Sequence, residues 1–101
     1  MIIYGIKNCD KVRAALKQAE QAGHDVRLHD FRSDGIDAKL VQAMLADIDK
    51  NKLVNKRSAS YRQLDKDTQQ HIGIETLVAH PTLIKRPVVY FNGHYQIGLP
   101  A

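Results

Sequence analysis

Cys9 is the residue of this sequence whose type and position could do redox chemistry. It follows a short apolar run, Ile2–Tyr4, that ends at Gly5, and a helical pattern begins at about Asp10. Exposed N–H groups and the dipole at a helix N-terminus stabilise an anion, which lowers the pKa of a thiol there. The alternative is a buried, inert cysteine. The order strand, cysteine, helix favours a reactive nucleophile.

Three further residues flank this thiol. Lys7 precedes it and Arg13 follows it by one helical turn, so both can add positive potential at Cys9. Asn8, between them, is of a type that caps helices. Because the chain has one cysteine, it can form no internal disulfide, and any redox cycle needs an outside thiol.

Two basic clusters could complete a binding site. Asn55-Lys56-Arg57 lies in a basic segment, and Lys85-Arg86-Pro87 directly precedes an apolar, β-branched run. Arginine binds carboxylates and oxyanions through a fixed two-pronged geometry. Each cluster by itself could equally be a solvated basic face, and a proline at the start of a strand is often an edge device.

Composition narrows the possible functions. The 101 residues predict one domain, with a net charge of +4 that favours anionic partners, small anions included. The few aromatic residues make nucleic-acid binding an unfavoured alternative. The five histidines lack metal-ligand spacing, so we expect no metal site. No signal peptide or membrane span is recognisable, and a lone thiol suits the cytoplasm.

The elements that must position Cys9 form a predicted βαβ unit. Ile2–Tyr4 is typical of a buried strand, and a helix from about Asp10 to Ala22 ends at Gly23. The alternating residues 26–30, extended by Phe31, predict a second strand parallel to the first through a right-handed crossover.

The middle of the chain predicts a helical insertion at about residues 33–80. Asp37 is a cap for the first helix, and Asn51–Ser60 is expected to be irregular. A short helix over Tyr61–Asp65 and a longer one over Asp67–Ala79 should follow.

The last part predicts a hairpin. Val88–Phe91 and Tyr95–Ile97 are strand-like and are joined by Asn92-Gly93, a strong hairpin signal. The fold class is therefore α/β, with a mixed four-stranded sheet in one domain, residues 1–101.

Several motifs together resemble the arsenate reductase family, and most closely its small arsenate-reductase-like bacterial branch near the Spx-type regulators. They extend in order over nearly the whole chain: Tyr4–Asp10, Asp34–Asp37, Asn55–Arg57 and His80–Val88. The resemblance implies a thioredoxin-like fold and Cys9 as the nucleophile. It also implies a cis Pro87 beside the thiol and glutathione as the outside thiol. The substrate site that we expect from these arguments comprises Arg57, Arg86, Pro87, Asn8, Lys7 and Arg13.

The sequence also departs from that family. Established arsenate reductases carry a further arginine near the C-terminus, whereas this chain has none after Arg86 and ends at Ala101 without a terminal helix. Three functions follow, in order of preference. The first is a glutathione-dependent thiol reductase, which could also act on a protein thiol, and the second is an arsenate reductase. The third is an Spx-like regulator whose basic face binds RNA polymerase, although a single cysteine excludes an intramolecular disulfide switch.

Overall fold

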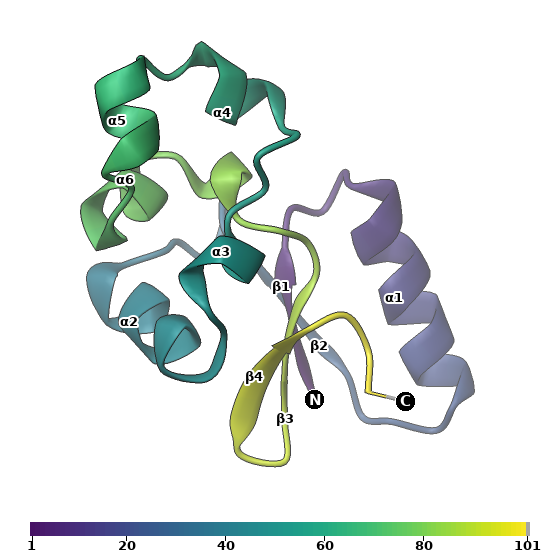
Figure 1. Cartoon of the computed structure of the whole chain (residues 1–101). Helices are drawn as coiled ribbons and strands as arrows, with labels where there is room; N and C mark the ends of the chain where they lie inside the picture. The colour runs from purple at the N-terminus through teal and green to yellow at the C-terminus, as the bar shows by residue number, and fades with distance from the viewer. Residues whose placement is uncertain (101) are drawn as a thin grey trace. The chain divides into compact units, whose positions relative to one another are not determined.

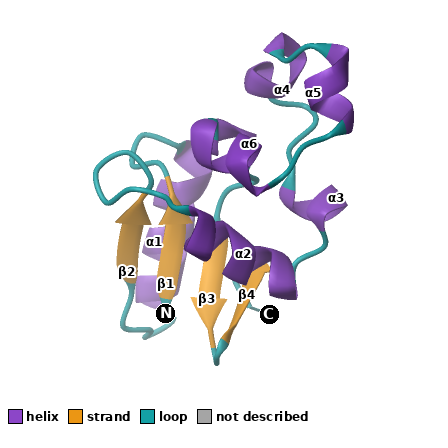
Figure 2. Cartoon of the chain, turned by 90° about the vertical axis from the view of Figure 1, so that its left-hand side faces the viewer, coloured by secondary structure: helices purple, strands orange, loops and turns teal. Residues whose placement is uncertain are grey.

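Residues from both ends of the chain form one sheet in the computed structural model, which describes residues 1–100. Its strands are β1 (Ile2–Gly5), β2 (Arg27–Asp30), β3 (Val88–Phe91) and β4 (His94–Ile97), in the order β2-β1-β3-β4. β1 runs parallel to β2 and antiparallel to β3, and β3 runs antiparallel to β4 (Figures 1 and 2). The mixed four-stranded sheet and the α/β class are confirmed.

Helix α1 (Asp10–Gln21) covers one face of this sheet (Figure 2). Ile3 of β1 and Val89 of β3 are paired neighbours, and both side chains are buried against the apolar stripe of the helix. That stripe consists of Val12, Ala15 and Ala19, at the spacing of one helix face. Full burial of an aliphatic side chain stabilises a fold by about 1.5–3 kcal/mol, so this layer fixes the helix on the strands.

The hairpin turn between β3 and β4 is as predicted. Asn92 has φ 53° and Gly93 has φ 84°, so both central residues are left-handed. A turn of this mirror-image kind matches the twist of the flanking strands, which explains the preference for Asn-Gly.

Residues Ile36–Lys85 form a second compact unit, separate from the first unit of Met1–Gly35 and the chain from Arg86 onward. It contains α2 (Ala38–Asp47), α3 (Lys50–Leu53), α4 (Ala59–Gln63), α5 (Lys66–Gln70), α6 (Ile74–Ala79) and the 3₁₀-helix η1 (Pro81–Leu83). Helix α2 packs against α6, and the backbone pair Val54–Ile84 joins the segment after α3 to the segment after η1. The prediction of a single domain with a helical insertion stays a prediction.

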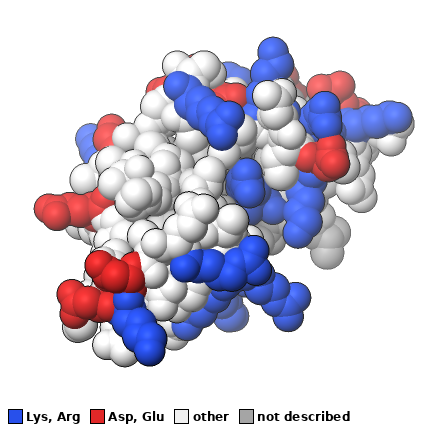
Figure 3. All heavy atoms as spheres, turned by 90° about the horizontal axis from the view of Figure 1, so that it is seen from above, with Lys and Arg blue, Asp and Glu red and all other residues white. Residues whose placement is uncertain are grey.

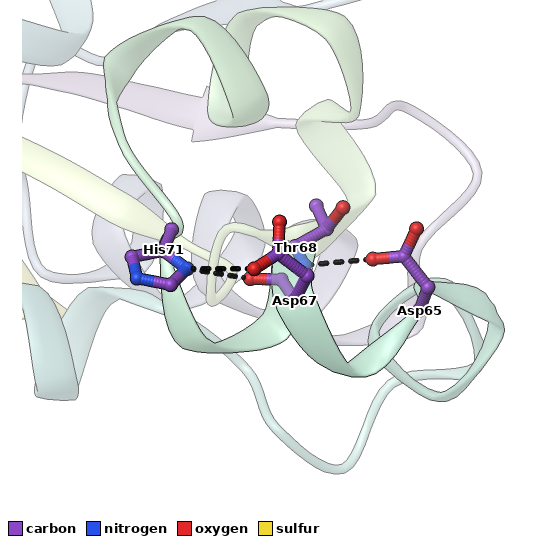
Figure 4. Close-up of polar contacts among 4 residues, drawn as sticks. All are labelled: Asp65, Asp67, Thr68 and His71. Carbon is purple, nitrogen blue, oxygen red and sulfur yellow. Dashed lines mark hydrogen bonds and ion pairs between the residues drawn. The ribbon is translucent and has the colours of Figure 1, made fainter.

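Side-chain caps start several of these helices. The Asp37 carboxylate accepts the Leu40 N–H at 2.8 Å, as predicted for the start of α2. At the N-cap of α5, Asp65 accepts the Thr68 N–H at 2.7 Å (Figure 4). Hydrogen bonding to the Thr68 side chain first, and then to this N–H, lowers the pKa of Asp65. One helical turn later, His71 Nδ1 lies 2.9 Å from the backbone oxygen of Asp67.

Three local predictions were wrong. The segment expected to be irregular contains α3 and the start of α4, because Leu53 is fully buried and Ser58 caps α4 through the Tyr61 N–H. The helix expected over 67–79 is broken into α5 and α6, since Gly73 is extended at φ −129° and ψ −168°. Finally, β2 ends at Asp30, and Phe31 lies buried in the following turn.

Candidate active site at the end of the strands

Cys9 occupies the N-cap position of α1. Its N–H donates to the Ile6 carbonyl at 3.0 Å, which closes a tight turn after β1, and its own carbonyl accepts the Arg13 N–H at 3.0 Å. The side chain is half-buried, packs against the core under α1 and makes no cap hydrogen bond. The thiol therefore stands beside the first turn of a twelve-residue helix, where backbone N–H groups lack helical partners.

The three polar residues predicted around the thiol are all exposed. Lys7 and Asn8 form the middle of the turn, and Asn8 is not the cap, because Cys9 itself takes that position. The Arg13 guanidinium pairs with the Asp10 carboxylate on the surface of α1. This exposed pair offsets part of the positive potential that Arg13 was expected to supply.

Arg86 and Pro87 lie at the same end of the sheet as this turn. β1 and β3 are antiparallel and Tyr4 pairs with Val88, so the C-terminal end of β1 is beside the start of β3 (Figure 1). Arg86 and Pro87 directly precede β3, both are half-buried, and the peptide bond between them is cis, as the resemblance implied. The pairing of these strands thus groups two distant parts of the sequence.

Arg57 belongs to the helical unit. It is exposed in the loop before α4, and its N–H donates to the Asn55 side-chain oxygen at 3.1 Å. The other predicted site residues, Lys7, Asn8, Cys9, Arg13, Arg86 and Pro87, all belong to the strand unit.

Asp30 is a residue of this region that the sequence did not single out. Its side chain is 8% exposed at the end of β2, and it accepts the Lys7 N–H at 2.9 Å and the Arg32 N–H at 2.7 Å. These backbone hydrogen bonds, that of Arg32 foremost, lower the pKa of Asp30 despite its burial. A carboxylate at the end of a strand, just before the turn residues 33–35, was the available signal.

Tyr4 and Tyr95 form a second polar feature of the strand unit that the sequence did not single out. Their rings lie 5.7 Å apart, centroid to centroid, and their side chains are hydrogen-bonded. Burial first, and then this hydrogen bond, raises the pKa of Tyr4. Tyr4 therefore stays a neutral phenol at physiological pH.

Basic side chains are common on the surface of the protein. Lys and Arg side chains are exposed over much of the face in Figure 3, in keeping with the net charge of +4. Among residues 1–100, no group of three or more His, Cys, Asp or Glu side chains could hold a metal ion. In the same residues, no helix has the length and apolar character needed to cross a membrane.

Residues 4–101 match the family model of the ArsC family. The chain belongs to this arsenate reductase family. It is 38% identical to an uncharacterised protein of Haemophilus influenzae over 100 residues, which are 95% of this chain and 88% of that protein. Among solved structures, a protein called YFFB superposes with a TM-score of 0.88 at 27% identity, over 98% of this chain and 90% of that one.

An arsenate-reductase-related protein of Brucella melitensis superposes with a TM-score of 0.79 at 31% identity, over 98% of this chain and 86% of that one. Membership of the family, and with it the thioredoxin-like fold, confirms what the motifs implied.

Proposed function

We propose that the protein is a glutathione-dependent thiol reductase in which Cys9 is the only nucleophile. The observation that carries the proposal is the position of Cys9, half-buried at the N-cap of α1 and at the same end of the sheet as Arg86. Helix N-terminal N–H groups and nearby cations both stabilise a thiolate. Family membership supports the same class of chemistry.

The proposed reaction has two exchange steps. The Cys9 thiolate attacks the glutathione sulfur of a mixed disulfide, RS–SG, so that a Cys9–SG bond forms while the RS–SG bond breaks, and RS⁻ leaves and is protonated. A second glutathione thiolate then attacks Cys9–SG, releasing the Cys9 thiolate and oxidised glutathione. The sum of the two steps is RS–SG plus one glutathione giving RSH plus oxidised glutathione, so the sulfur of the substrate is reduced to a thiol while the incoming glutathione thiol is oxidised to the disulfide. An outside thiol is required because the chain has no second cysteine.

The cationic residues would hold glutathione and leave its thiol free to react. Arg86 and Arg57 suit the two carboxylates of the tripeptide, since a guanidinium binds a carboxylate through two parallel hydrogen bonds. Lys7, Asn8 and Arg13 are exposed around the thiol and would add polar contacts. Pro87 would line the same site from the start of β3. We propose that this chemistry takes place in the reducing cytoplasm.

Arsenate reduction is the second candidate, favoured by the likeness to the Brucella melitensis protein. The Cys9 thiolate would form a sulfur–arsenic bond while one arsenate oxygen leaves as water. Two glutathione thiols would then supply two electrons and release arsenite together with oxidised glutathione. Binding of RNA polymerase stays a prediction of the resemblance alone.

A turnover assay with a glutathione mixed disulfide of a small thiol, in the presence of reduced glutathione, tests the proposal. We expect Cys9→Ser to abolish turnover, and we expect mass spectrometry of the parent chain to detect one glutathione on Cys9. Ala14→Ser, at an exposed position of α1, is the matched control and should keep full turnover. Full activity of Cys9→Ser would disprove the proposal. A parent chain that turns over arsenate but not mixed disulfides would favour the second candidate.

A further inference from the structure

The turn that carries Cys9 is attached to the neighbouring strand as well as to its own. The Phe31 N–H donates to the Gly5 carbonyl at 2.9 Å, which extends the β1–β2 ladder past its last pair. Beyond that point the main-chain ladder ends, and the Lys7 N–H would have no strand partner. The Asp30 carboxylate, 23 positions away in the sequence, accepts a hydrogen bond from this N–H at 2.9 Å.

Asp30 is itself firmly held. Its second oxygen accepts the Arg32 N–H, its backbone N–H donates to the Asp34 carboxylate at 2.9 Å, and its carbonyl accepts the Asp34 N–H at 2.7 Å. A buried carboxylate with this many fixed partners has little rotational freedom. It therefore provides a rigid anchor for a turn whose middle residues are otherwise exposed.

The anchor acts two residues before the thiol. Lys7 is the second residue of the turn that Cys9 closes through its N–H to Ile6. Cys9 has no side-chain hydrogen bond of its own to fix it as the cap of α1. The orientation of the Cys9 backbone therefore depends on the turn over residues 6–9, and that turn is held by the hydrogen bond from the Lys7 N–H to Asp30.

We propose that Asp30 is a positioning residue that, through the Lys7 N–H, holds Cys9 where the first turn of α1 stabilises its thiolate. The inference rests on the proposed function and adds a residue of a different element to it. Asp30 does not touch the substrate; it acts through the turn.

The direction in which the ionisation of Cys9 shifts when Asp30 is removed distinguishes a positioning role of Asp30 from an effect of its charge alone. Removing a negative charge near a thiol eases its ionisation, whereas moving a thiol away from helix N–H groups hinders it. Loss of Asp30 by charge alone would thus shift thiol ionisation to lower pH, and loss of positioning would shift it to higher pH. Asp30→Ala leaves the other charged residues of this part of the strand unit unchanged: Lys7, Asp10, Arg13, Arg32, Asp34 and Arg86.

The test is the rate of Cys9 alkylation by iodoacetamide against pH, in the full chain and below the unfolding temperature of every variant. We expect Asp30→Ala to shift the midpoint of this profile upward by about half a pH unit, the size of one helix-terminus interaction. Glu20→Ala is the matched control, because it removes an exposed carboxylate of the same unit that touches neither Lys7 nor Asp30. If Asp30→Ala does not fold, Asp30→Leu, which has a similar shape and no acceptor for the Lys7 N–H, takes its place.

The outcomes distinguish this inference from the proposed function, since alkylation needs no glutathione. Suppose that the alkylation profile of the parent chain has a low midpoint and that Asp30→Ala leaves this midpoint unchanged or lowers it. That result would overturn the role of Asp30 but not the proposed function. An equal upward shift in Glu20→Ala would do the same, because it would show that loss of any carboxylate of this unit has the effect. A parent midpoint at the ordinary thiol value of about 8.5 would count against the proposed function itself.

Discussion

Gly5 and Val12 lie in such close contact that a Cβ atom on residue 5 would stand 2.5 Å from Cγ2 of Val12. Gly5 is the last residue of β1, and Val12 is in the first turn of α1 with no exposed surface. The glycine lets the helix approach the strand at the point where the chain turns from one to the other. The start of α1, and with it Cys9, is therefore set by the absence of a side chain.

Gly5→Ala should destabilise the fold by about 1–3 kcal/mol, the usual cost of forcing a methyl group into a filled core. Val12 is β-branched and fully buried, so its side chain cannot turn aside cheaply. Urea unfolding measures the loss. Gly73→Ala is the control, since an added Cβ there meets nothing within 4 Å and its φ is −129°. Equal losses in the two variants would contradict this account of Gly5.

Gly93→Ala should lower stability by about 1 kcal/mol, because φ 84° places the new Cβ against the following carbonyl. Asn92→Gly should be nearly neutral, as glycine adopts φ 53° without strain. Thermal unfolding followed by circular dichroism compares the two. A neutral Gly93→Ala would mean that the turn relaxes to another geometry.

Elements with strong local signals were predictable from the sequence. Asn92-Gly93 specifies its own hairpin, and the periodic apolar stripe ending at Gly23 specifies α1. The middle of the chain was harder because its helices are short. Lys50–Leu53 is helical largely because Leu53 is buried, and burial in a tertiary contact is not visible locally.

The candidate site was predictable only in part. A cysteine after a strand and before a helix has a recognisable local pattern, as do arginine clusters. Asp30 gave only a weak signal, a carboxylate at the end of a strand, since its role lies in a hydrogen bond from the Lys7 N–H across 23 residues. Its role depends on the parallel register of β1 and β2, in which Gly5 pairs with Asp30.

Arg86→Ala and Arg57→Ala should each raise the glutathione concentration needed for half-maximal turnover by about tenfold, with a smaller effect on the maximal rate. Loss of a hydrogen bond to a charged group costs about 1.5–3 kcal/mol. Steady-state kinetics against glutathione concentration measures it. Arg62→Ala removes the same charge from an exposed position of α4 and should change little. A matching effect of Arg62→Ala would indicate general charge attraction instead of a site.

Acid should weaken the fold through Asp30. Its pKa is lowered in the folded state, so its stabilising contribution is fully present above the unfolded value of about 3.9 and is lost as pH falls through the folded pKa. The stability difference between the parent chain and Asp30→Asn should be largest near neutral pH and should shrink on acidification. Urea unfolding from pH 6 to pH 3 follows this difference, with Glu20→Gln, at an exposed position of α1, as the charge-matched control. A difference that stays constant with pH would contradict the assignment.

The adjacency of β1 and β3 has a consequence for biosynthesis. Ile2 pairs with Tyr90, so β1 finds its antiparallel neighbour only after nearly ninety further residues have been made. Until then, Ile3 has α1 and β2 beside it but lacks Val89, and one edge of β1 offers unpaired backbone groups to other chains. Closure of the sheet therefore brings together residues far apart in the chain, and a contact across so long a loop forms late in folding.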